Sequence, residues 1–269
     1  MSRTQQEGRN HWALVTGASA GIGEAFANEF AQNGFNLILV ARRKERLEVL
    51  AGQLTDKFQI KVEVITADLS DPKVPKRLYK ELHKKQIKPS VLVNNAGYAV
   101  KTGFTDTSWK VQADILQVMM TAVTELCHLF VEDMKAQHYG RIINVASVAA
   151  FTPQIPGNLY GGIKSYVACL SEALHMELSE FGINCTAVCP GFTRSEFHDV
   201  MEVKEATGKF PSFMWSSAEE VAAQGYRAVM TGKPLCIPGG LNKLVVGAIG
   251  MLPRSMLFKV GKQQALFGE

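Results

Sequence analysis

The stretch TGASAGIG, residues 16–23, lies between an apolar run and a helical pattern near the start of the chain. The run WALVTG (12–17) suits a buried strand, and GEAFANEFAQNG (23–34) has phenylalanines four residues apart and a closing Asn-Gly, which stops a helix. A glycine-rich turn between strand and helix lets backbone N–H groups approach a pyrophosphate, whose charge the helix N-terminus favours. A tight turn without a ligand gives the same pattern, so the stretch alone leaves the ligand open.

Further apolar runs follow this first unit, separated by stretches long enough for helices. They are NLILVA (36–41), KVEVIT (61–66), SVLVNN (90–95), RIINVAS (141–147), NCTAVCP (184–190) and KPLCIP (233–238). Most are apolar almost throughout, as expected for strands buried on both faces. Strands alternating with helices predict an α/β fold with one doubly wound parallel sheet of about seven strands and helices on both faces.

The composition is that of an ordinary globular protein, with 269 residues, 46% apolar and 20% charged, and a net charge of +4. Basic residues are scattered apart from one cluster within residues 42–46, so nucleic-acid binding is disfavoured. The cysteines are odd in number without a CxxC pair, and the histidines lack metal-ligand spacing, so we expect no disulfide framework and no metal site. Without a signal peptide or a long uninterrupted apolar run, we expect no membrane span and a cytoplasmic location.

The end of the second predicted strand bears on the type of nucleotide. Ala41 is followed by Arg42 and Arg43, with no carboxylate. In a nucleotide-binding βαβ unit a carboxylate there binds the ribose 2′-hydroxyl, whereas an arginine accommodates a 2′-phosphate. Cations at a helix N-terminus are unfavourable, and a bound anion would offset them. We predict NADP(H) over NAD(H); a basic cluster facing solvent is the alternative.

The stretch LYGGIKSY (159–166) places Tyr160 and Lys164 one helical turn apart on the same face. Reducing a carbonyl requires a hydride at carbon and a proton at oxygen, and a tyrosine can donate that proton if a neighbouring cation lowers its pKa from ~10. Ser147 ends the fifth predicted strand, where α/β sheets bind ligands. Each residue alone has a simpler explanation, as surface decoration or as a strand-end turn.

Together these motifs resemble the classical short-chain dehydrogenase/reductase family. The resemblance runs from about residue 11 to about 238 and includes TGASAGIG, ADLS with Asp68, NNAG (94–97), Ser147, Tyr160-x-x-x-Lys164 and PG (190–191). It implies a single Rossmann-type domain over residues 1–269. It also implies catalysis by Ser147, which polarises the carbonyl, Tyr160, which donates the proton, and Lys164, which supplies charge and holds the nicotinamide ribose.

The resemblance also implies a cofactor site for NADP(H). Asp68 would bind the adenine, residues 94–97 would line the adenosine ribose and stabilise the central strand, and residues 190–193 would cover the nicotinamide. The full set is Gly17, Ser19, Ala20, Gly21, Ile22, Gly23, Arg42, Arg43, Asp68, Leu69, Asn94, Asn95, Ala96, Gly97, Tyr160, Lys164, Pro190, Gly191, Phe192 and Thr193.

Two positions depart from the family pattern. Met119 stands where the family usually has an asparagine that completes a proton relay through water to the lysine, and a thioether cannot donate a hydrogen bond. We expect an altered relay, or a backbone carbonyl and water in its place, with the reaction type unchanged. Ala20 stands where NADP-preferring relatives often carry a basic residue, so Arg42 and Arg43 carry the NADP prediction.

The substrate contacts are expected from the loop after Ser147 and from a lid at about 192–216. Their apolar side chains indicate a hydrophobic ketone, aldehyde or acyl-type substrate, although a lid sealed onto the core would look the same. They are Phe151, Ile155, Phe192, Phe197, Phe210, Phe213, Met214 and Trp215.

An apolar extension at about 239–269 resembles tails of reductases that act on lipid-like substrates. It could lie on a membrane surface, cover the pocket or join subunits, and we favour a pocket or subunit contact. A homodimer or homotetramer is expected through residues 107–135 and 158–181. Leu116, Met120, Val123 and Cys127 form an apolar stripe there, which core packing explains equally well.

The sequence therefore predicts an NADP(H)-dependent oxidoreductase that transfers a hydride between the nicotinamide and a carbonyl or secondary alcohol. A 3-oxoacyl-carrier reductase is an alternative, which the sparse basic character near the site disfavours. An NADP(H)-binding sensor or scaffold with little turnover is an alternative of another class, which the intact Ser147, Tyr160 and Lys164 disfavour.

Overall fold

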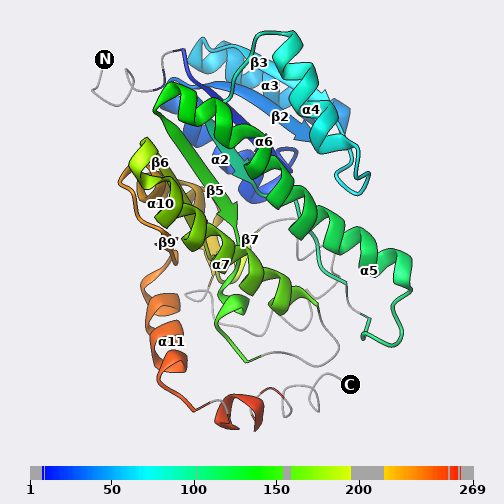
Figure 1. Ribbon diagram of the computed structural model, residues 1–269, viewed down its shortest axis with the longest axis vertical. Helices are drawn as coiled ribbons and strands as arrows, with labels where there is room; N and C mark the ends of the chain where they lie inside the picture. The colour runs from blue at the N-terminus through cyan, green and yellow to red at the C-terminus, as the bar shows by residue number, and fades with distance from the viewer. Residues whose placement is uncertain are drawn as a thin grey trace.

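Seven parallel strands form one sheet in the computed structural model, in the order β3-β2-β1-β4-β5-β6-β9 (Figure 1). The structure describes residue 8 and residues 10–100, 102–153, 159–194, 215–253, 255–259 and 261. The strands are β1 (Trp12–Thr16), β2 (Asn36–Ala41), β3 (Val62–Thr66), β4 (Val91–Asn94), β5 (Gly140–Val145), β6 (Ile183–Val188) and β9 (Leu235–Cys236). Each of the predicted strands is present, and the doubly wound parallel sheet is confirmed.

The strands are apolar throughout because both faces of the sheet are covered. Along β1, Ala13 and Val15 belong to one core cluster and Leu14 to another on the opposite face. On the first face lie α2 (Gly21–Gln32), α3 (Lys44–Phe58) and α10 (Ala218–Met230). On the second lie α4 (Val74–Lys84), α5 (Trp109–Leu116), α6 (Ala122–Gln137) and α7 (Tyr160–Leu178). This is a Rossmann-type fold.

A π-helical turn, η1 (Gln117–Thr121), joins α5 and α6 into one helix. The 29 residues from Trp109 to Gln137 are long and apolar enough to cross a membrane by length and composition alone, and half of the most apolar window is buried within the protein. Cys127 lies in the core and Val123 is buried, and Leu116 and Met120 pack against the core. Core packing therefore explains the apolar stripe, and the expectation of no membrane span stays a prediction.

Short elements surround the carboxyl ends of the strands. They are η2 (Val148–Ala150), β7 (Thr193–Arg194), β8 (Ser216–Ser217) and α11 (Gly240–Gly250), whereas η3 (Ser179–Phe181) directly precedes β6 at the opposite edge. The predicted lid begins and ends on the paired strands β7 and β8. Its residues Phe197, Phe210, Phe213 and Met214 lie outside the described residues, as does Ile155.

Figure 1 shows that the turn after β5, the first turn of α7 and α11 all lie at the carboxyl end of the sheet. In an open α/β sheet this edge binds ligands at the point where strand order reverses, here between β1 and β4. The fold therefore brings residues from distant parts of the sequence to one edge.

Candidate active site

The glycine-rich turn after β1 fits tightly against the NNAG segment after β4. Gly17 has φ +66°, and a Cβ there would lie 2.7 Å from Asn95 Nδ2 and 3.0 Å from Ala96 Cα. Thr16 Oγ1 accepts hydrogen bonds from the backbone N–H groups of Asn95 (2.9 Å) and Ala96 (3.1 Å). Asn95 Nδ2 donates to the carbonyl oxygen of Thr16 (3.0 Å). The two predicted cofactor motifs are thus brought together, and Gly17 is required by both space and conformation.

The first turn of α2 follows this glycine turn. No side chain caps the helix, whose N-cap residue is Ala20. Uncapped N–H groups at a helix start favour an anion, and the turn brings Ser19, Gly21 and Ile22 to the same end of the helix. This geometry fits the pyrophosphate of a dinucleotide.

Arg43 reaches from the end of β2 across to this turn. Its Nε and Nη2 atoms donate to Ser19 Oγ at 3.1 and 3.0 Å. Arg42 is exposed, with Nη1 4.0 Å from Asp68 Oδ2. Arg43 therefore contacts the glycine turn and Arg42 lies beside Asp68, both among the residues expected to meet the adenosine half of the nucleotide, and their charges fit an NADP(H) phosphate.

Three predicted cofactor residues also serve the fold itself. Asn94 is buried, and its Nδ2 donates to Asn144 Oδ1 on β5 at 2.8 Å, so its side chain ties β4 to β5 as the expected support of the central strand. Leu69 is a core residue. Asp68 Oδ1 accepts from the backbone N–H of Ser70 at 3.0 Å, a turn contact beside its ion pair with Arg42.

Ser147, Tyr160 and Lys164 come together at the carboxyl end of β5. Lys164 is buried, its Nζ donates to the carbonyl oxygen of Val145 at 2.8 Å, and it lies 5.4 Å from the ring centroid of Tyr160. The Tyr160 hydroxyl shares a hydrogen bond with Ser147. Ser147 Oγ also accepts from the backbone N–H of Ala149 at 3.1 Å, which orients it. The three predicted catalytic side chains form one contact group.

The ionisable groups of this trio are tuned by burial. Burial raises the pKa of Tyr160 to about 12, against a smaller lowering effect of the Ser147 hydrogen bond. Burial lowers the pKa of Lys164 to about 8. The expectation that Lys164 lowers the tyrosine pKa is wrong for the chain by itself, because desolvation favours the neutral form of both groups.

Cys189 was not predicted as part of this site. The residue is fully buried, its thiol is hydrogen-bonded to the backbone of Ser147, and burial raises its pKa to about 12. The one available signal was its position between β6 and Pro190. Its neutral thiol lies close enough to Lys164 for the two groups to interact electrostatically.

The PG turn after β6 packs beside the serine loop. The carbonyl oxygen of Pro190 accepts from the backbone N–H of Val148 at 3.0 Å. Thr193 Oγ1 donates to the carbonyl oxygen of Gly191 at 3.1 Å. A Cβ on Gly191 would lie 2.6 Å from the Asn242 side chain, so α11 abuts this turn. The rings of Phe192 and Trp215, at the two ends of the predicted lid, lie in contact at a tilt, with centroids 5.5 Å apart.

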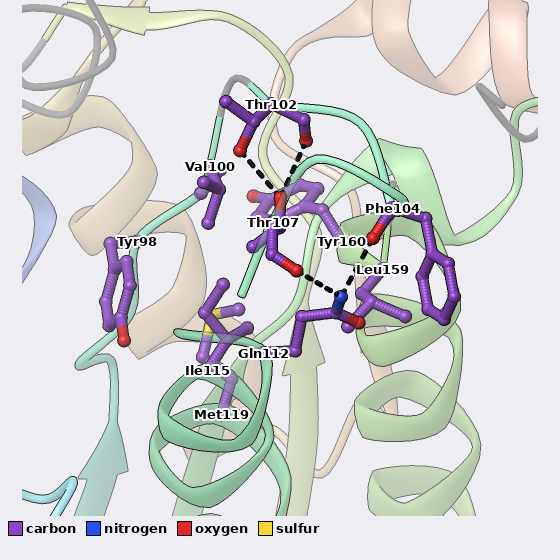
Figure 2. A pocket seen from close by; sticks show the side chains of 11 residues that line it. Tyr98, Val100, Thr102, Phe104, Thr107, Gln112, Ile115, Met119, Leu159 and Tyr160 are labelled. Carbon is purple, nitrogen blue, oxygen red and sulfur yellow. Dashed lines mark hydrogen bonds between the residues drawn. The ribbon is translucent and has the colours of Figure 1, made fainter. Parts of the chain in front are cut away.

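A hollow opens beside Tyr160, and Figure 2 shows the side chains around it. Most of its lining is apolar, and Gln112 secures the rim by donating to the carbonyl oxygens of Phe104 (3.0 Å) and Thr107 (2.9 Å). The lining residues are Tyr98, Ala99, Val100, Thr102, Phe104, Thr107, Gln112, Ile115, Met119, Leu159 and Tyr160.

The sequence analysis placed the substrate contacts elsewhere, in the loop after Ser147 and in the lid. The described hollow is instead formed chiefly by residues 98–119, after β4, and no residue of α11 lines it. Phe151 packs against a small core cluster. The apolar and aromatic residues Tyr98, Val100 and Phe104 in the loop after β4 were the available signal.

Met119 forms part of this hollow at the π-turn. It is almost fully buried, and its sulfur lies 2.8 Å from the position that a Cβ on Gly97 would take. A side chain at position 97 would collide with Met119, so the presence of Met119 requires a glycine at position 97. The position of the expected asparagine is filled by a packing side chain.

The fold and the site define a nicotinamide-dependent oxidoreductase of Rossmann type. The family profile described as short chain dehydrogenase matches residues 11–206, and the chain belongs to this family. Hydroxysteroid dehydrogenase-like protein 1 from Gallus gallus is 32% identical over 215 residues, covering 79% of this chain and 63% of that protein, so the chain spans less than two thirds of it. Very-long-chain 3-oxoacyl-CoA reductase from Anas platyrhynchos is 29% identical over 267 residues, with 95% and 81% coverage.

A solved structure supports the same assignment. The short-chain dehydrogenase from Sphingobium yanoikuyae in complex with NADPH superimposes with a TM-score of 0.79 at 29% identity, covering 90% of this chain and 96% of that one. The chain is thus similar in fold to an NADPH-binding enzyme.

Proposed function

We propose that this protein is an NADP(H)-dependent reductase of apolar ketones, aldehydes or acyl-type carbonyl compounds, working reversibly as an alcohol dehydrogenase. The observation that carries the proposal is the contact group of Ser147, Tyr160 and Lys164 beside an apolar hollow. A cytoplasmic location and a homo-oligomeric state belong to the same proposal.

The described residues fit the cofactor. The glycine turn and the uncapped start of α2 would hold the pyrophosphate, and Arg42 and Arg43 would meet a 2′-phosphate. The NADPH bound to the Sphingobium yanoikuyae enzyme supports this choice. When bound, the cofactor supplies the hydride and, in its oxidised form, a positive charge near Tyr160.

Proton transfer falls to Tyr160. Its pKa of about 12 keeps the phenol protonated at neutral pH, which is the form that donates a proton to the carbonyl oxygen during reduction. Ser147 shares a hydrogen bond with that phenol and would direct its own hydroxyl to the same oxygen. Lys164, whose pKa is about 8, would offset the phenolate charge left on Tyr160.

The apolar hollow supports a hydrophobic substrate. Val100, Ile115, Met119 and Leu159 offer no hydrogen-bonding side chain beside Tyr160. The relatives are named for a hydroxysteroid dehydrogenase-like protein and for a very-long-chain 3-oxoacyl-CoA reductase. A lipid-like ketone is therefore the first candidate, and a 3-oxoacyl thioester, favoured by the second name, is the alternative.

The decisive experiment follows NADPH oxidation with ketones and aldehydes of graded chain length, with NADH and the variant Tyr160→Phe alongside. We expect turnover that prefers NADPH and rises with substrate apolarity. Tyr160→Phe should lower kcat by about 10²–10⁴-fold, because it removes the proton donor, and leave the NADPH dissociation constant near that of the wild type. Tight NADPH binding without turnover of any carbonyl would instead favour the sensor or scaffold.

A further inference from the structure

The described part of the carboxyl-terminal extension carries its large apolar side chains on the outside. No residue of α11 is buried. Exposed large hydrophobic residues elsewhere in the described chain are scattered over Val49, Phe104, Trp109, Met176 and Phe181. Between residues 240 and 259, by contrast, the exposed large hydrophobic residues are concentrated in one short segment. They are Leu241, Leu244, Val245, Met251, Leu252, Met256 and Phe258. Such a concentration on one segment marks an interaction surface.

The helix α11 has a side facing the protein and a side facing away. Asn242, Val246 and Ile249 are partly buried, and Asn242 Nδ2 donates to the carbonyl oxygen of Pro238 at 2.8 Å. Residues spaced three and four apart share a helix face, and the exposed Leu241, Leu244 and Val245 have this spacing. The helix is thus anchored by one side and presents an apolar face to its surroundings.

The positive charge of the extension indicates which kind of partner can bind to this apolar face. No acidic residue occurs between Glu220 and Glu269, whereas Lys243, Arg254, Lys259 and Lys262 are basic. Lys243 and Lys259 are exposed. A second copy of the chain docked on this face would bring the like charges of two extensions together, which opposes self-association through this face. An anionic lipid surface instead accepts the apolar side chains at the acyl boundary and the cations at the headgroups.

We infer that the exposed apolar surface of residues 240–259 docks the protein onto an anionic lipid bilayer. An 11-residue helix is about 16 Å long, well short of the ~30 Å hydrocarbon core, so α11 lies in the interface and does not cross it. Docking goes beyond the proposed reductase activity and does not depend on it.

The position of this surface has a consequence for substrate entry. Figure 1 shows α11 at the lower left and α5 at the right, both in the half of the molecule beyond the carboxyl ends of the strands. Phe104, on the rim of the hollow, is an exposed apolar side chain. A docked protein would therefore hold the half of the molecule that carries the substrate hollow near the bilayer, where an apolar carbonyl compound is concentrated.

Vesicle co-sedimentation of the full chain tests the inference. Vesicles of phosphatidylcholine alone are compared with vesicles containing about one third phosphatidylserine. We expect binding to the anionic vesicles at least about tenfold stronger than to neutral ones, and weaker at high salt. Substituting Leu244→Glu together with Phe258→Glu, which are 73% and 76% exposed, should weaken binding at least about tenfold. The matched control Val49→Glu, at a residue 62% exposed on α3, should bind as the wild type does.

Three further measurements keep the inference falsifiable. Thermal unfolding should be unchanged in both variants, and if the double variant unfolds, Lys243→Gln with Lys259→Gln replaces it and should remove the preference for phosphatidylserine. Reduction of a water-soluble aldehyde without vesicles should also be unchanged, which separates docking from catalysis. Absence of vesicle binding, binding indifferent to these substitutions, or a dimer that the double variant dissociates without any vesicle binding would overturn the inference.

Discussion

The two halves of the cofactor site are held in place by different forces. Around the glycine turn, Thr16, Asn95, Ser19 and Arg43 hold one another through hydrogen bonds between protein groups. Around Tyr160 and Lys164, burial shifts both pKa values toward the neutral forms, although Lys164, with a pKa of about 8, still carries its proton at neutral pH. The first half is therefore organised by direct hydrogen bonds, whereas the ionisation of the second half is set by desolvation.

The largest effect is expected where the first half is most crowded. Gly17→Ala should lower the free energy of unfolding by about 1–3 kcal/mol and weaken NADPH binding at least about tenfold, because φ is positive and the methyl group would meet Asn95. Gly52→Ala is the control: it lies within α3 with open space around it and should stabilise the protein by about 0.5–1 kcal/mol. Urea unfolding and fluorescence titration measure both, and equal effects at the two glycines would refute the contrast.

A pH series tests the second half. Burial lowers the pKa of Lys164 from its ordinary value of 10.5 to about 8 in the folded protein, so between these values the unfolded chain binds more protons. The free energy of unfolding of the wild type, minus that of Lys164→Met, should therefore rise from pH 8 toward pH 10 by up to about 3 kcal/mol. The difference is used because the raised pKa values of Tyr160 and of buried cysteines such as Cys189 act in the opposite direction in both proteins. A difference that does not change with pH would mean that Lys164 is solvated.

Substitution of Arg43 tests how far the residues around the glycine turn determine the preference for NADPH over NADH. Arg43→Ala should raise the NADPH dissociation constant about 10- to 100-fold and change that for NADH little, because under the proposed function the guanidinium would meet the 2′-phosphate, which NADH lacks. Ser19→Ala should have a smaller effect in the same direction, since Ser19 holds the guanidinium. Lys44→Ala on the same helix is the control. Equal weakening of both nucleotides would place Arg43 elsewhere on the cofactor.

The substitution Met119→Asn tests the half of the site around Tyr160 and is expected to change turnover less than the other substitutions change their measured quantities. Activity should be kept or raised, because the amide could serve the proton relay, while the free energy of unfolding falls by about 1–3 kcal/mol as a polar group enters a buried site. Met119→Leu, the control, should leave both nearly unchanged. A large loss of turnover in a folded Met119→Asn protein would contradict the placement of this residue.

The sheet could be predicted from the sequence, whereas the chemistry of the site could be predicted only in part. Strands such as NLILVA are apolar because their side chains enter both cores, which is a local pattern. The grouping of Ser147, Tyr160 and Lys164 followed from motif spacing. The rise in the Tyr160 pKa, the thiol of Cys189 beside Ser147 and the wall formed by residues 98–119 depend on tertiary packing, which no local pattern encodes.

The π-turn η1 gives this family member a place where chain length can change. A π-turn accommodates one residue more than the α-helix around it, so a one-residue deletion within Gln117–Thr121 lets the helix close into regular α geometry. The same deletion inside α6 would rotate every later side chain by about 100° and take Phe130 out of the core. One continuous helix lines the substrate hollow in its first part and packs into the core in its second part. The π-turn between the two parts allows the first part to lose a residue while the side chains of the second part keep their places in the core.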